Sequence, residues 1–147
     1  MVYTTSAIAL ISILISLLPG KMIPSGAEEA TSSVAIDFEG VRISSGSLFI
    51  AIFDNENDWL KRPVRSYIME IDKLDCSWTV DDLPNGAYGL AVFHDVNSNG
   101  KNDTNFLGIP KEPWGVSNDV RRRLGPPRWS QAQFLVRSDT TFTIGLK

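Results

Sequence analysis

The sequence predicts an all-β protein, a single Ig-like β-sandwich of about seven strands with one long loop that carries a short helix. Short runs of alternating apolar and polar residues recur along the chain, and turn-forming residues separate them. No long segment has helical periodicity, and 147 residues suggest one domain. The single cysteine, Cys76, excludes an intramolecular disulfide, so the core alone must hold the fold.

The N-terminal stretch differs from the rest of the chain. Ala7–Leu18 contains twelve apolar or small residues and is followed by Pro-Gly. It is too short to span a bilayer, which needs about 20 residues, but it fits the apolar region of a signal peptide. We therefore predict a signal peptide over residues 1–27 and a β-sandwich over residues 28–147, exported to the periplasm or beyond the cell. No lysine or arginine precedes Ala7, so an uncleaved anchor is the alternative.

Removal of residues 1–27 leaves all 17 acidic residues and 13 of the 14 basic ones, for a net charge of −4. A mildly acidic domain lacks the basic surface that binds nucleic acid or anionic membranes. We expect neither partner, and no stable membrane span after signal cleavage.

The first strands follow from their patterns. Val34–Glu39 alternates apolar and polar residues, as in a half-buried strand, and ends at Gly40. Ser47–Phe53 is nearly all apolar, which predicts a strand in the middle of a packed sheet. Five polar residues end it, and Val64–Ile71 is a weaker strand candidate.

The later strands are separated by turn signals. Cys76–Val80 alternates cleanly, and Pro84-Asn85-Gly86 predicts a turn before the strand Ala87–Phe93. Ala132–Val136 and Thr140–Leu146 are expected to form a hairpin.

Between these strands, Asp95–Ser130 has little strand pattern. Ser117-Asn118-Asp119 could cap a short helix over Val120–Leu124, with Gly125 ending it. The arginines within that helix could bind an anion, although a solvated helix face is the simpler interpretation. Structureless segments of this length are usually functional when they occur in compact domains.

The start of this segment resembles a calcium-binding loop. Oxygen-bearing side chains fall at positions 1, 3, 5 and 9 counted from Asp95, and Gly100 at position 6 permits the sharp turn. Position 12 is Phe106, where an EF-hand needs a bidentate glutamate, so an EF-hand is excluded. The predicted Ca²⁺ ligands are Asp95, Asn97, Asn99, Asp103 and the backbone carbonyl of Lys101.

Calcium takes 6–8 oxygen ligands, so water or a distant carboxylate must complete this shell. Glu112 is the nearest candidate and Asp119 is another. The alternative is an Asn-Gly turn whose polar side chains bind their own backbone.

Two other sets of residues could carry a function. His94, Asp95 and Glu112 could form the acid–base or metal site of an envelope hydrolase, although His94 is also explained as a strand-end histidine bonded to a neighbour. Trp59, Trp114 and Trp129 could stack on a glycan or fill a partner's pocket, although aromatic residues in loops more often anchor those loops.

The residues of the long segment also carry a family resemblance. The succession LPNGAYGLAVFHDVNSNGKNDTNFLGIPKEPWGVSND, followed by GPPRWSQAQF, closely resembles the exported bacterial family catalogued as domain of unknown function 2141. Trp114 stands where a tyrosine is commoner and Val116 where a phenylalanine is. The matching positions are Leu83, Pro84, Gly86, Tyr88, His94, Asp95, Asn97, Asn99, Gly100, Asp103, Gly108, Ile109, Pro110, Glu112, Trp114, Gly115, Ser117, Asn118, Gly125, Pro126 and Pro127.

The resemblance implies a transthyretin-like β-sandwich in a secreted or periplasmic protein, and it implies no reaction. It also places Glu112 in the same site as the Asp95 loop. The sequence thus favours an exported, non-enzymatic module, stabilised by Ca²⁺, that binds a protein or glycan partner; the hydrolase is the alternative.

Overall fold

The computed structural model describes residues 29–122 and 125–147. The predicted signal peptide, residues 1–27, lies outside the described residues and stays a prediction. In the described part, eight strands form two sheets, which confirms the all-β sandwich. The strands are β1 (Thr31–Glu39), β2 (Ser47–Phe53), β3 (Arg65–Glu70), β4 (Cys76–Pro84), β5 (Gly86–Asp95), β6 (Trp114–Val116), β7 (Phe134–Val136) and β8 (Thr140–Gly145).

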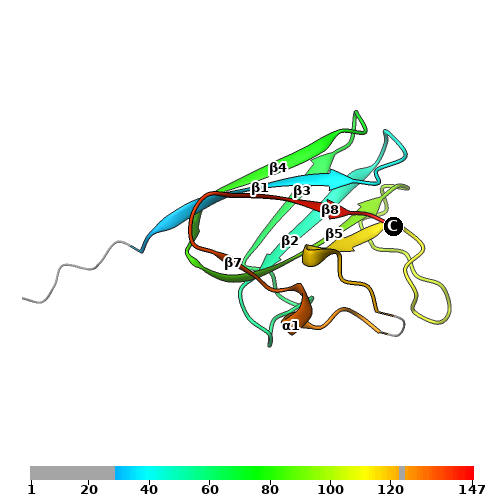
Figure 1. Ribbon diagram of the computed structural model, residues 1–147. Helices are drawn as coiled ribbons and strands as arrows, with labels where there is room; N and C mark the ends of the chain where they lie inside the picture. The colour runs from blue at the N-terminus through cyan, green and yellow to red at the C-terminus, as the bar shows by residue number, and fades with distance from the viewer. Residues whose placement is uncertain (1–28, 123–124) are drawn as a thin grey trace, which may run out of the picture.

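The smaller sheet has the order β4-β1-β8, and the larger has the order β3-β2-β5-β6 with β7 also paired to β5. All neighbouring strands are antiparallel except β1 and β8. Figure 1 shows the two sheets facing each other, with the one-turn helix α1 (Trp129–Ala132) on the side of β2 and β5 that faces away from β1 and β8.

The main core lies between the sheets and is built by alternation. Leu48, Ile50 and Ile52 of β2 point inward and are almost fully buried, as are Val34 and Ile36 of β1. Cys76 is buried in the same core, where loss of hydration raises the pKa of its thiol. It therefore packs as a small apolar residue of the core.

The expected hairpin between the last two strands is wrong. β7 pairs with β5 through Gly86↔Val136, whereas β8 pairs in parallel with β1 through Val34↔Thr140. The linker between them therefore crosses from one sheet to the other. This crossing buries Val136 and Ile144 in the shared core from opposite sides.

The helix expected over Val120–Leu124 is also wrong for its described residues, 120–122, which are not helical. A 3₁₀ turn at Ser117–Asp119 precedes them, and Asn118 has a positive φ of 61°. The predicted cap side chains bind elsewhere: the Asn118 amide donates to the carbonyls of Gln131 and Gln133, and Asp119 accepts from the N–H of Gly145. These hydrogen bonds connect segments that are distant in the sequence, and they do not cap a helix.

Two short elements were not expected: β6, with only three residues, and α1. Across the described ranges, no helix has both the length and the apolar character needed to cross a membrane.

Candidate functional site: an apolar groove beside an acidic loop

The outer face of the larger sheet, turned away from the other sheet, carries two rows of side chains across the strands. The strand register aligns Ile68, Phe49, Phe93 and Trp114 in one row, and the Phe49 and Phe93 rings stack with centroids 4.8 Å apart. The neighbouring row consists of smaller residues, which leave a hollow beside the aromatic row. They are Ser66, Ala51, Ala91 and Val116.

A second apolar cluster closes one end of this face. Phe53, Trp59 and Trp129 pack edge to face, and Trp59 Nε1 donates a 2.8 Å hydrogen bond to the carbonyl oxygen of Pro127. Gly89 makes this packing possible, because a Cβ there would lie 2.7 Å from the Trp59 ring. The cluster thus ties the segment around Pro127 to the sheet.

A tight turn stands beside the hollow. The Asn105 side-chain oxygen accepts the N–H groups of Leu107 and Ile109 at 2.9 and 3.0 Å, and Gly108 adopts the positive φ that the turn requires. The turn holds its apolar side chains outward, so that Phe106 is 95% exposed and Leu107 is 68% exposed. The hydrogen bonds of the turn therefore keep Phe106 and Leu107 exposed.

Together these segments line a groove of about 980 Å³. Its floor is the outer face of the sheet, and the turn and the segment from Gly125 to Pro127 contribute to its walls. Among the described lining residues, only five carry polar side-chain atoms and none is acidic: Ser66, Tyr67, Asn102, Trp114 and Arg122. The Asn102 Oδ1 atom is buried without a hydrogen-bond partner in the described structure. The lining is thus mostly apolar with a few localised polar groups, a composition typical of ligand pockets.

The predicted metal loop begins where β5 ends, and its first carboxylate is buried. Asp95 is 1% exposed, and its two oxygens accept the backbone N–H groups of Asn99 and Gly100 at 3.1 and 2.7 Å. These bonds curl the chain immediately after the strand.

Glu112 binds the same loop from the other end of the segment, and its predicted role as a Ca²⁺ ligand stays a prediction. It is 8% exposed, and its oxygens accept the N–H groups of Val96 and Asp103 at 3.0 and 3.1 Å. The two carboxylates therefore hold the beginning and the end of one loop.

The remaining predicted ligands form an exposed network around Asp103. One Asp103 oxygen accepts the side-chain amides of Asn97 and Asn99, and these two hydrogen bonds lower the pKa of the Asp103 carboxyl. The N–H of Lys101 donates to the Asn99 side chain. The side chains thus make the local bonds of a polar turn.

Within the described part of the chain, neither Asp95 nor Glu112 forms an ion pair with a basic side chain. In residues 29–122 and 125–147, the one ion pair within 4.0 Å joins Arg62 and Asp58. In the same ranges, no three His, Cys, Asp or Glu side chains are grouped as a metal site. Calcium also takes amide and backbone oxygens, so its binding here stays a prediction.

His94 is placed apart from these carboxylates. It is 1% exposed, and its Nε2 lies 2.8 Å from the carbonyl oxygen of Ser45, so this nitrogen carries a proton and donates it. Because His94 and Asp95 are consecutive in a strand, their side chains point to opposite faces. His94 and Asp95 therefore do not face a common cleft, and the hydrolase alternative stays a prediction.

The three tryptophans are not arranged as a glycan platform. Trp59 and Trp129 are buried, and their rings are inclined by 65°. Trp114 is partly buried under the guanidinium of Arg121, 4.6 Å from the ring centroid. Stacking on sugars needs exposed, parallel rings, and the Trp59 and Trp129 pair provides neither.

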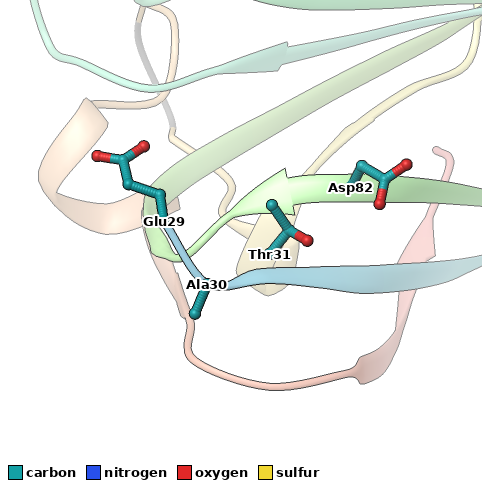
Figure 2. Close-up of a pocket in the computed structure, with 4 residues that line it drawn as sticks. All are labelled: Glu29, Ala30, Thr31 and Asp82. Atoms are coloured by element: carbon teal, nitrogen blue, oxygen red, sulfur yellow. The ribbon is translucent and has the colours of Figure 1, made fainter. Parts of the chain in front are cut away.

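A second hollow lies where the described chain begins and is lined by Glu29, Ala30, Thr31 and Asp82. Figure 2 shows that the carboxylates of Glu29 and Asp82 point in different directions. No chemistry converges there.

Fold and site together define a β-sandwich with a loop-walled apolar groove on one outer face. The chain belongs to the family described as uncharacterized protein conserved in bacteria (DUF2141), which matches residues 36–144. No curated protein and no solved structure matches the chain, so the transthyretin-like assignment stays a prediction.

Proposed function

We propose that the protein is an exported, non-enzymatic binding module that holds an apolar ligand, or the apolar part of a partner, in the outer groove. The observation that carries this proposal is the groove itself. Exposed apolar patches on monomers are usually small, and larger ones mark interaction sites. A protein partner therefore suits the lining better than a glycan, whose hydroxyl groups need hydrogen bonds that the lining does not supply.

Calcium binding is the second part of the proposal. Buried charges are usually paired or bound to metals, and Asp95 and Glu112 are buried carboxylates without a basic partner in the described ranges. Each carboxylate oxygen accepts one N–H, which leaves a second lone pair for a cation. Asp103, Asn97, Asn99 and the Lys101 carbonyl would supply the remaining oxygens.

The two parts are connected along the chain. The loop that the cation would hold continues directly into the Asn105–Ile109 turn, whose Leu107 and Ile109 line the groove. A cation in the loop would therefore hold one wall of the groove at a fixed distance from the sheet.

The groove is tested with the uncharged fluorescent probe N-phenyl-1-naphthylamine. We expect saturable binding with enhanced emission, and loss of that binding in Ala51→Leu, which fills the floor of the hollow. Ser77→Leu on the exposed face of β4 is the matched control, because it adds the same apolar surface away from the groove. Binding that survives Ala51→Leu, or no binding at all, contradicts the groove as the functional surface.

The ion is tested by thermal unfolding in EDTA, in millimolar CaCl₂ and in millimolar MgCl₂. A cation at a hundredfold excess over its Kd stabilises the folded state by about 2.7 kcal/mol, and each kcal/mol raises Tm by roughly 4–8 °C for a small domain. We expect a Ca²⁺-specific rise that Asp103→Asn reduces. An unchanged Tm in all three solutions excludes the ion.

A further inference from the structure

We propose that the groove binds a single-chain anionic amphiphile, with its alkyl chain on the sheet and its carboxylate at Arg122. This inference rests on the proposed function, because it names the ligand class of the same groove. The protein would then be a carrier or receptor for a free alkyl carboxylate of medium chain length.

The scarcity of polar groups in the lining decides against an extended peptide. Each peptide residue brings a backbone N–H and a C=O, and both must find partners when they are buried. The floor of the groove is the side-chain face of the sheet, so its backbone groups are already paired within the ladder. An alkyl chain has no polar groups, so its burial on this surface leaves no hydrogen bond unmade.

The positive charge in the lining favours a ligand with a negative charge. Among the described lining residues Arg122 alone is charged, and its guanidinium donates to the carbonyl oxygen of Pro126 at 2.8 Å. It has no carboxylate within 4.0 Å in the described ranges. An arginine presents five donors in a planar fork that matches a carboxylate, so it can keep this bond and still bind an anion.

The size of the floor fits a chain of medium length. The two rows cross β3, β2, β5 and β6, and three strand spacings amount to about 14 Å. An extended twelve-carbon chain is of this length, so dodecanoate is the appropriate probe.

The experiment measures displacement of N-phenyl-1-naphthylamine from the full-length protein by dodecanoate, by uncharged 1-dodecanol and by an uncharged apolar peptide, all below micelle-forming concentrations. We expect dodecanoate to displace the dye at the lowest concentration. Arg122→Gln should raise its half-displacing concentration about three- to tenfold, which is typical for loss of one partly exposed charge pair, and leave that of 1-dodecanol unchanged. Arg42→Gln, an exposed arginine in the β1–β2 loop, is the control for net charge.

The outcomes separate the two proposals. If the dye binds and Ala51→Leu abolishes its binding, but dodecanoate does not displace it, the amphiphile is excluded and the groove function stands. If the peptide displaces the dye better than dodecanoate does, the ligand is a protein segment and the inference is overturned. If Arg122→Gln changes the half-displacing concentrations of dodecanoate and 1-dodecanol equally, Arg122 does not bind the carboxylate and the inference is overturned. If the dye does not bind, both proposals fail.

Discussion

The two faces of the larger sheet are made by the same strands but serve different ends. On the inner face, Leu48, Ile50 and Ile52 pack against a second sheet and are at most 1% exposed. On the outer face, Phe49 and Ala51 alternate with them in the same strand, yet only loops and one helical turn lie above. At these positions of β2 the second sheet covers the inner face completely, whereas loops cover the outer face only in part. The inner face therefore stabilises the fold, and the outer face leaves room for a ligand.

The largest effect should come from the inner face. Ile36→Ala removes a fully buried side chain between the sheets and should cost about 2–5 kcal/mol of unfolding free energy, measured by urea titration. Phe49→Ala on the outer face should cost less, because Phe49 is only partly buried and its neighbours border the groove. An equal loss of unfolding free energy in both variants would show that the outer face is a second core. It would contradict the proposed difference between the two faces.

A smaller loss of stability is expected from a buried serine that joins the larger sheet to α1. Ser117 is fully buried; its hydroxyl donates to the carbonyl of Ala132 at 2.5 Å and accepts the N–H of Leu90 at 3.0 Å. It therefore joins β5 to α1 above the outer face. Ser117→Ala leaves both backbone groups unpaired and should cost about 1–3 kcal/mol.

The same variant should weaken dye binding in the groove, because α1 carries Trp129 of the cluster that closes it. Ser130→Ala, an exposed serine in the same helical turn, is the control and should change neither quantity. A stability loss without any change in dye affinity would show that α1 does not shape the groove.

Sequence patterns predict the inner face well, and the reason is local. Ser47–Phe53 is a nearly all-apolar run that polar residues follow, and the observed β2 has the same limits. By contrast, β6 has three residues, too few for a period to be recognised. Asn118 and Asp119 look like helix caps, but their partners are more than ten residues away in the chain. Local signals fail where side chains make distant bonds.

The groove could not be predicted for the same reason. Its floor places Ala51 beside Ala91 and Val116, and that alignment depends on the register of three strands. The acidic loop was recognisable because its ligand-type residues lie close in sequence. Asp95 and Glu112 do bind one loop, but whether a cation joins them depends on charge balance, which the spacing of residues does not determine.

The smallest expected effect concerns acid. Hydrogen bonds from Asn97 and Asn99 hold the pKa of Asp103 below its usual value of 3.8. A carboxyl with a lowered folded-state pKa contributes stability above its unfolded pKa and loses it as the pH falls through the folded value. In EDTA, the difference in unfolding free energy between the wild type and Asp103→Asn should therefore be constant near neutral pH and shrink towards zero below the usual carboxyl pKa. Asp72→Asn, an exposed aspartate between β3 and β4, controls for general acid effects. A difference that stays constant into strong acid would mean that the charge of Asp103 does not organise the loop, and the polar turn would owe its shape to Asp95 and Glu112 alone.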